Sequence, residues 1–323
     1  MAICPIFIFS NPRAGSTLVQ RVIAAHDGVA TTSEPWLLLP HLYALREEGL
    51  VAEYPHRVGV AALREFCEEL PDGVDDYRRE LHDFVLRIYE RAADPDSRYF
   101  LDKTPPYYFI ADEIMRLFPE GRFVFLWRNP LSVMASTIET WLDGRWHPTA
   151  YSDGLFVGMP RLVSSYLANR DAAFAVRYED LVGGGTVQWE ALMRYLGIEF
   201  EPAALERFGE VDLAGQMGDR AGRERYTALS TEPTQKWKKT LANPLRRTWA
   251  RHYLRWLGDE RLAVMGYDRA QIMREMDALP LSFRGIGPDL ARLGQAIALE
   301  PARAFSRRLG VGSPSVLMEL ARA

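Results

Sequence analysis

The segment that most constrains this chain lies near its start. Pro5–Phe9 is a short run of Ile and Phe that ends in a polar turn, a pattern typical of a buried strand in a parallel sheet. The polar loop Ser10–Thr17 follows, and apolar residues then recur at helical spacing to about His26. A strand, a tight loop and a helix in this order predict the first βα unit of an α/β fold.

The rest of the chain continues to alternate strands with helices. Further strands are predicted at Tyr99–Leu101, Phe123–Trp127 and Phe174–Val176. Helices are predicted at about Val74–Ala93, Ile110–Leu117, Leu131–Trp141 and Leu155–Asn169, and later at Trp189–Leu196, Pro244–Leu257 and Asp259–Met265. We therefore expect an α/β fold in which a parallel β-sheet is flanked by helices, with a mostly helical second half.

Composition excludes several classes of protein. The 323 residues are 48% hydrophobic and carry a formal charge of −4, which suits a globular chain and argues against a generally basic nucleic-acid binder. No apolar run reaches the ~20 residues of a membrane span, and the N-terminal segment lacks the basic start of a signal peptide. The two cysteines, Cys4 and Cys67, argue against a disulfide scaffold and a cysteine zinc site, so we expect a cytoplasmic protein.

The C-terminal segment differs in composition from the rest. From about Leu281 it holds six Arg against three acidic residues, and Gly and Pro interrupt it. We therefore divide the chain into a main domain, residues 1–280, and a C-terminal helical appendage, residues 281–323. Packing on the main domain is the simplest interpretation of the appendage, while a dimer arm or a contact with a membrane surface is left open.

The loop after the first strand keeps part of the phosphate-binding pattern G-x-x-x-x-G-K-[ST]. Gly15 and Thr17 match that pattern, but Ser10 replaces the first Gly and Ser16 replaces the Lys. Backbone N–H groups at a helix N-terminus attract an anion, and a Gly lets the backbone approach it closely. The loop therefore predicts a phosphate site, although a Pro/Gly turn with a Ser helix cap would also explain it.

Two later segments favour a phosphate ligand. Arg128 follows the predicted strand Phe123–Trp127, and Ser136 lies about two helical turns further on. A P-loop nucleotide hydrolase normally carries a magnesium-binding Asp at the end of a core strand. A guanidinium with a hydroxyl suits a second phosphate instead, and we expect no metal. Tyr178, after the strand Phe174–Val176, is either a nucleotide contact or a side chain at the edge of the core.

Taken together, these segments resemble the sulfotransferases that use 3′-phosphoadenosine 5′-phosphosulfate (PAPS). The resemblance rests on Asn11–Leu18, on Arg128-Asn129-Pro130 with Ser136, and on Arg177–Leu181, and it covers roughly residues 5–270. It implies a sulfotransferase fold of the P-loop type. The Arg in the first loop is similar to the branch that includes tyrosylprotein and many bacterial sulfotransferases, whereas the cytosolic small-molecule enzymes carry Lys there.

The resemblance also implies contacts with the co-substrate. In the family the first loop holds the 5′-phosphosulfate, and the Arg and Ser that match Arg128 and Ser136 bind the 3′-phosphate. The implied contacts are Arg13, Ala14, Gly15, Ser16, Thr17, Leu18, Arg128, Ser136, Tyr178 and Lys236.

Three residues form the core of the predicted catalytic centre. Sulfuryl transfer needs a base for the acceptor hydroxyl and cations near the transferring and leaving groups. By the resemblance, Arg13 lies at the sulfonate, Lys103 assists the leaving group, and Glu34, 21 residues after Arg13, is the base. The alternatives are a surface Lys before a Pro turn, a Glu that caps the next helix, and His26 as the base.

A fourth catalytic candidate lies in a basic segment. Ser230 follows the Arg-rich stretch 218–225 and precedes Lys236. The family closes such a segment over the nucleotide, with a Ser near the sulfate. Arg220, Arg223 and Lys238 are further candidates for phosphate contacts, and a solvated basic face is the alternative for each of these side chains.

The sequence constrains the acceptor less than the nucleotide. Thr140 stands where the tyrosylprotein branch has a second Arg. The stretch between Thr137 and Pro160 is rich in Trp, Tyr, Phe and Gly, which predicts either a substrate-side lid or an aromatic part of the core. We expect an acceptor hydroxyl on a small molecule, sugar, lipid-linked alcohol or phenol. No nucleic-acid partner is expected, and a homodimer is left open.

Two other functions compete with sulfuryl transfer. A P-loop kinase-like phosphotransferase is disfavoured because the loop lacks its Lys and because Arg128, not a magnesium-binding Asp, follows the strand Phe123–Trp127. A non-catalytic nucleotide-binding module is disfavoured because it would not need Arg13, Glu34 and Lys103 together.

Overall fold

The computed structural model describes residues 3–147, 153–183, 185–213 and 228–308, and its centre is a five-stranded parallel sheet. The strands are β1 (Cys4–Ser10), β2 (Val29–Thr31), β3 (Tyr99–Asp102), β4 (Arg122–Trp127) and β5 (Ala173–Arg177). Their order is β2-β3-β1-β4-β5, and every neighbouring pair is parallel. The predicted α/β fold with a parallel sheet is therefore confirmed.

The side chains of β1 show why this strand lies at the centre. Ile6 and Ile8 face one side of the sheet, and Phe7 and Phe9 face the other. All four side chains are fully buried, because helices cover both faces. Each face thus has its own hydrophobic core, and the sheet separates the two.

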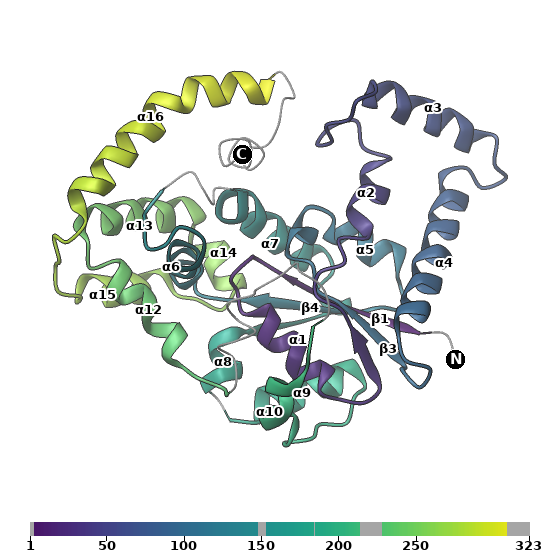
Figure 1. Cartoon of the computed structure of the whole chain (residues 1–323), viewed down its shortest axis with the longest axis horizontal. Coiled ribbons are helices and arrows are strands. Elements are labelled where there is room, and N and C mark those ends of the chain that lie inside the picture. The colour runs from purple at the N-terminus through teal and green to yellow at the C-terminus, as the bar shows by residue number, and fades with distance from the viewer. Residues whose placement is uncertain (1–2, 148–152, 184, 214–227, 309–323) are drawn as a thin grey trace.

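Helices cover the sheet in two layers (Figure 1). One layer contains α1 (Ser16–Ala24), α8 (Tyr178–Gly183), α9 (Val187–Leu196) and α10 (Ala204–Arg207). The opposite layer contains α5 (Ala111–Leu117), α6 (Pro130–Trp141), α7 (Met159–Ala168), α13 (Pro244–Leu257) and α14 (Asp259–Val264). Both layers pack on the sheet through apolar side chains. The polar carboxyl ends of the strands are therefore left for the edge of the sheet, where parallel strands end together.

The remaining helices and turns lie outside the two layers. Between β2 and β3 the chain forms α2 (Leu38–Tyr43), α3 (His56–Glu68) and α4 (Val74–Ala92) at one end of the molecule (Figure 1). Single turns are the 3₁₀ turns η1 (Pro105–Phe109), η3 (Arg170–Ala172) and η4 (Phe208–Glu210) and the π turn η2 (Asp153–Gly158). The last helices are α12 (Glu232–Thr240), α15 (Arg269–Asp277) and α16 (Ile286–Arg308).

The start of α16 is fixed to the main body by one acidic side chain. Asp289 is buried and accepts hydrogen bonds from Arg246 Nε at 2.7 Å and from Asn243 Nδ2 at 3.1 Å. Both donors lie at the beginning of α13, so this turn of α16 is part of the packed structure. The division of the chain at residue 280 stays a prediction.

The predicted elements agree with the structure within about two residues at most ends. The helices α3, α12 and α15 were not predicted, and two further differences have a clear cause. The strand β2 was not predicted, because it has three residues and only Val29 is buried. The helix predicted at Leu155–Asn169 begins as the π turn η2 and becomes regular α7 only at Met159.

Candidate functional site

The five strands end at one edge of the sheet, and polar residues predicted for the site follow the strands there. The carboxyl ends of parallel strands are the usual ligand site of an open α/β sheet. The loop 11–15 follows β1, Glu34 follows β2, Lys103 follows β3, Arg128 follows β4 and Tyr178 follows β5. Each strand therefore supplies at least one of the residues predicted from the sequence.

The loop after β1 has a backbone that favours Gly at one position. Gly15 has φ +93°, and a Cβ built there would lie 2.3 Å from a ring carbon of Tyr178. Ala14 N–H donates to Asn11 O at 3.1 Å, which tightens the turn. Ser16 and Thr17 are the first residues of α1, where backbone N–H groups lack intrahelical acceptors. The loop is therefore shaped as an anion-binding turn.

Seven of the predicted residues line one cavity of about 260 Å³ beside this loop. They are Arg13, Leu18, Arg128, Ser136, Tyr178, Ser230 and Lys236. The cavity also contains carboxylates, Glu139 and Glu232. We call this set the nucleotide-side pocket.

Arg128 is the most enclosed cation of the nucleotide-side pocket, with 4% of its surface exposed. Its Nη1 donates to Arg13 O at 2.7 Å, and its Nη2 donates to Pro233 O at 2.8 Å. Its guanidinium lies 4.6 Å from the centre of the Tyr178 ring. The buried Nε of Arg128 makes no hydrogen bond within the described residues. The side chain thus joins the β1 loop to α12 and retains one unused donor.

The side chain of Arg13 turns toward α6. The residue has φ +65°, and its guanidinium donates to Ser136 Oγ at 3.2 Å and to Thr140 Oγ1 at 3.1 Å on α6. The guanidinium therefore lies beside Ser136, a residue predicted to bind the 3′-phosphate. Its role at the sulfonate stays a prediction. Thr140, which departs from the tyrosylprotein pattern, accepts one of its hydrogen bonds.

A second group of residues lies on the β2–β3 side of the loop. Lys103 Nζ donates to Glu34 Oε1 at 2.7 Å and lies 3.5 Å from Thr17 Oγ1 at the start of α1. Lys103 is only 1% exposed. Trp36, with a left-handed backbone of φ +54°, donates its indole N–H to Glu34 Oε2 at 3.3 Å. We call Glu34, Lys103 and Thr17 the acceptor-side cluster.

Sequence reasoning missed the buried carboxylate of Asp102. It is fully buried beside Lys103 and accepts hydrogen bonds from Tyr89, Tyr107 and Thr104. Burial raises the pKa of Asp102 to about 6, while these hydroxyls and the Lys103 charge act in the opposite direction. The available signal was an Asp directly after an apolar strand, where a charge needs buried partners.

The alternative base, His26, lies at the other end of α1 from the loop. It is buried, with Nδ1 3.9 Å from Glu201 Oε1, and burial lowers the pKa of its imidazole. The helix α1 spans Ser16–Ala24, so its length separates His26 from the acceptor-side cluster. The structure therefore brings Glu34, and not His26, next to Lys103.

The basic segment before α12 is only partly described. Ser230 is exposed, lines the nucleotide-side pocket and accepts a hydrogen bond from Glu232 N–H at 3.2 Å. Lys238 lies 3.6 Å from Glu275 Oε2 and is not part of the pocket. Arg220 and Arg223 lie outside the described residues.

The aromatic stretch after Thr137 contributes mainly to the core. Trp146 is fully buried, and Phe156 packs against Tyr253 and Trp256 of α13. The turn η2 also contacts the β1 loop, because a Cβ at Gly158 would lie 2.6 Å from Asn11 Oδ1. Tyr151 lies outside the described residues. Core packing accounts for Trp146 and Phe156, whereas Trp141 is 49% exposed, so the substrate-side lid stays a prediction.

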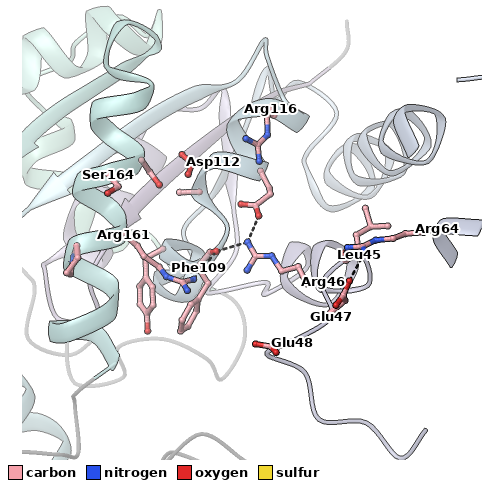
Figure 2. Close-up of a pocket in the computed structure, with 15 residues that line it drawn as sticks. Leu45, Arg46, Glu47, Glu48, Arg64, Phe109, Asp112, Arg116, Arg161 and Ser164 are labelled. Atoms are coloured by element: carbon pink, nitrogen blue, oxygen red, sulfur yellow. Dashed lines mark hydrogen bonds and ion pairs between the residues drawn. The ribbon is translucent and has the colours of Figure 1, made fainter. Parts of the chain in front are cut away.

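A larger cavity of about 710 Å³ lies between the end of α2, α5 and α7 (Figure 2). Four Arg and four acidic residues line it, and Arg46 forms an ion pair with Glu113 and donates to Phe109 O at 2.9 Å. Arg64 is paired with Glu47 at 2.8 Å. The opposite charges balance, and none of the predicted site residues is present.

Two structural features are absent from the described parts of the chain. No helix there is long and apolar enough to cross a bilayer. No group of three or more His, Cys, Asp or Glu side chains there is arranged to hold a metal ion. The expected cytoplasmic location stays a prediction.

Comparisons with known proteins bear on both fold and function. Residues 5–202 match a sequence family described as "Sulfotransferase family". Nodulation protein NoeE of Sinorhizobium fredii is 27% identical over 73% of this chain, and the match spans 60% of that relative's length. Protein-tyrosine sulfotransferase 1 of Danio rerio is 23% identical over 81% of this chain and 72% of its own length. The solved sulfotransferase domain from the curacin biosynthetic pathway matches the fold with a TM-score of 0.51, at 21% identity, over 74% of this chain and 91% of that domain.

Proposed function

We propose that this chain, which belongs to the sulfotransferase family, transfers a sulfuryl group from PAPS to a hydroxyl group of an acceptor. The family match covers more than half of the chain and includes the carboxyl ends of all five strands. The matched residues after these strands are the β1 loop, Glu34, Lys103, Arg128 and Tyr178. Family membership supports PAPS as the donor, and the geometry of the strand ends supports the proposed roles of individual residues.

One observation supports catalysis most directly. Lys103 Nζ lies 2.7 Å from Glu34 Oε1 and 3.5 Å from Thr17 Oγ1. A buried cation therefore stands between a carboxylate and the first turn of the anion-binding helix. Transfer of a charged group in line requires this layout, with a base on the acceptor side and a cation close to the leaving oxygen.

The residues of the acceptor-side cluster have separate tasks in the proposed reaction. Bound PAPS supplies a sulfuryl group linked to its 5′-phosphate. Glu34 takes the proton of the acceptor hydroxyl while the acceptor oxygen forms its bond to sulfur. The bond from sulfur to the 5′-phosphate oxygen breaks, and its electron pair stays on that oxygen. Lys103 and the N–H groups at the start of α1 stabilise this charge.

The nucleotide-side pocket fits the other end of PAPS. Arg128 has a buried Nε with an unused donor, and Ser136 lies beside the guanidinium of Arg13. A guanidinium fork and a hydroxyl are suited to the 3′-phosphate. Tyr178, Ser230 and Lys236 complete the proposed binding surface, and Gly15 leaves room for the Tyr178 ring against the loop.

For the acceptor we propose a molecule with an accessible hydroxyl group. The Danio rerio relative is named for protein tyrosine, which is a phenol, and this supports a phenolic hydroxyl as one candidate class. Trp36 is partly exposed beside Glu34 and offers an aromatic surface to a ring. Sugars and lipid-linked alcohols remain in the acceptor panel.

Replacement of Glu34 by Gln tests the proposal. Glu34→Gln keeps the shape of the side chain but removes the base, so turnover should fall by roughly 10² or more. The full chain is incubated with PAPS and an acceptor panel, sulfated products are detected by mass spectrometry, and binding of 3′-phosphoadenosine 5′-phosphate (PAP) is measured by calorimetry. PAP affinity should stay nearly unchanged.

Glu113→Gln is the matched control, because it also removes a carboxylate from an ion pair but lies in the larger cavity. Its turnover should equal that of the parent chain. Near-parental turnover of Glu34→Gln would place the base elsewhere. Tighter binding of ATP than of PAP, or transfer from ATP with magnesium, would contradict the proposed donor.

A further inference from the structure

The carboxylate of Asp102 is the centre of a buried hydroxyl network at the end of β3. Tyr89 donates its hydroxyl to Oδ2 at 2.6 Å, and Tyr107 donates to the same oxygen at 2.9 Å. Thr104 donates to Oδ1 at 3.0 Å. The carboxylate and the Thr104 side chain are both fully buried. Three hydroxyl donors satisfy a charge that is far from water.

Two of these hydroxyls also hold the segment that carries Glu34. The Trp36 backbone N–H donates to Thr104 Oγ1 at 3.4 Å, and the Leu38 backbone N–H donates to the Tyr107 hydroxyl oxygen at 3.2 Å. Because each hydroxyl gives its proton to Asp102, its oxygen lone pairs are free to accept from the backbone. The segment is thus fixed two and four residues beyond Glu34.

The segment is fixed on its other side as well. Gln20 of α1 donates through Nε2 to the backbone oxygens of Thr32 at 2.6 Å and Ser33 at 3.3 Å. Trp36 has φ +54°, a left-handed conformation that is strained for a residue with a side chain. Such a conformation persists only where the surroundings enforce it. The bond from the Trp36 N–H to Thr104 and the bond from the Leu38 N–H to Tyr107 restrain the backbone at this strained residue.

We propose that Asp102 is a positioning residue, which acts through Thr104 and Tyr107 to hold the carboxylate of Glu34 beside Lys103. This inference rests on the proposed function, because it gives Glu34 the task of base. Asp102 itself is fully buried, so it is not accessible to an acceptor. Its effect reaches the reaction through the backbone of Trp36 and Leu38.

The charge of Asp102 is part of this arrangement. The groups that face it are Tyr89 of α4, Tyr107 of η1, and its chain neighbours Lys103 and Thr104. An ionised carboxylate accepts from all three hydroxyls. A neutral acid or an amide presents a donor to one of them, which must then turn its own proton elsewhere. The orientation of the two hydroxyls that hold the segment therefore depends on the negative charge.

The test removes one hydroxyl at a time and measures turnover, PAP affinity and melting temperature. Thr104→Val and Tyr107→Phe remove the bonds to Trp36 and Leu38, and each should lower kcat by about tenfold or more because the base is misplaced. PAP affinity should change by less than about twofold, since no group of the nucleotide-side pocket is touched. Thr104→Ser keeps the hydroxyl and should keep the parental kcat.

Tyr89→Phe is the matched control. It removes the 2.6 Å bond to the same carboxylate, but Tyr89 lies on α4 and makes no hydrogen bond to residues 34–38. We expect a lower melting temperature, comparable to that of Tyr107→Phe, with kcat within about twofold of the parent. If kcat falls in step with melting temperature in all of these variants, the network is structural and the inference is wrong.

The same substitutions in a Glu34→Gln background separate the inference from the proposed function. A residue that acts through Glu34 loses its effect when the base is absent, so Thr104→Val should lower kcat less than about twofold further in that background. Additive losses would overturn the role of Asp102 while leaving Glu34 as base. Parental turnover of Glu34→Gln alone would instead overturn the proposed base.

Discussion

The two halves of the strand-end edge are held together in different ways. In the acceptor-side cluster, Lys103 and Glu34 bond through their side chains, and Lys103 is almost completely buried. In the nucleotide-side pocket, Arg128 donates to backbone oxygens, and Arg13 donates to hydroxyls of α6. Lys236 there is partly exposed and lies 3.7 Å from Glu232.

By this difference, the side chains of the acceptor-side cluster are already arranged for the reaction, whereas those of the nucleotide-side pocket can change partners when a ligand binds. Groups that stabilise a transition state act best when they need no reorganisation, and a buried ion pair behind a fixed backbone meets that condition. Arg128 in the other half donates to backbone carbonyls, neutral acceptors that a phosphate oxygen can replace with a stronger charge-assisted bond. The comparison predicts that changes in the first half affect turnover and changes in the second half affect binding.

The largest effect should come from Lys103. Lys103→Met removes the buried cation but keeps much of its apolar stem, and kcat should fall by about 10²–10³-fold, as for loss of a prearranged donor. PAP affinity should stay within about twofold of the parent. Initial rates at saturating PAPS, with calorimetry for PAP, measure the two quantities.

Lys239→Met on α12 is the control for Lys103→Met, because Lys239 is exposed. A large loss of PAP affinity in Lys103→Met, with kcat unchanged, would place Lys103 in the binding half and break the comparison.

Arg128 should show the opposite behaviour. Arg128→Ala removes a charged donor of the nucleotide-side pocket and should cost roughly 1.5–3 kcal/mol of PAP affinity, with a smaller change in kcat at saturating PAPS. Arg128→Lys keeps the charge but not the fork, and should recover only part of the loss. Melting curves control for its bonds to Arg13 and Pro233. An unchanged PAP affinity would exclude Arg128 from nucleotide binding.

Asp102 should give the acceptor-side half a dependence of stability on pH. Its pKa in the folded chain is raised by burial to about 6 from an ordinary 3.8, so the protonated form favours folding. That contribution is present at low pH and is lost as pH rises through about 6. From about pH 8 to about pH 5, the parent should gain about 1.4 kcal/mol of unfolding free energy relative to Asp102→Asn.

Urea unfolding of the parent chain and Asp102→Asn at several pH values measures this difference. A difference that does not change with pH would mean that Asp102 keeps one protonation state throughout the range.

The smallest effect is expected for Lys236. Its pairing with Glu232 is exposed, and such pairs are worth about 1 kcal/mol or less. Lys236→Met should therefore weaken PAP binding by less than about fivefold, and added salt should shrink the difference. Calorimetry at low and high salt tests this. A loss larger than that of Arg128→Ala would show that the exposed rim dominates binding.

The fold was predictable from sequence because buried parallel strands are continuous apolar runs. Pro5–Phe9 and Phe123–Trp127 identify the two central strands, and the polar residues after them predict the site, since parallel strands end at one edge. The strand β2 was not predicted because its three residues form a strand only by pairing with β3. The local sequence pattern gives no information on that pairing.

The candidate site was predictable in membership but not in arrangement. Glu34 and Lys103 are far apart in sequence, and only the adjacency of β2, β3 and β1 brings them to 2.7 Å. The turn of Arg13 toward α6 depends on where that helix packs. The network of Asp102 needs Tyr89 from α4, a contact between elements that no single segment encodes.

The order of the strands also bears on how such a chain can diversify. Residues 32–98 leave the sheet after β2 and return at β3, and none of the residues that line the nucleotide-side pocket belongs to this span. Of the proposed catalytic residues, only Glu34 lies within it. The proposed base and the residues of the nucleotide-side pocket therefore lie on separate stretches of one chain. A substitution within residues 32–98 can alter the surroundings of Glu34 without replacing any residue that lines the nucleotide-side pocket.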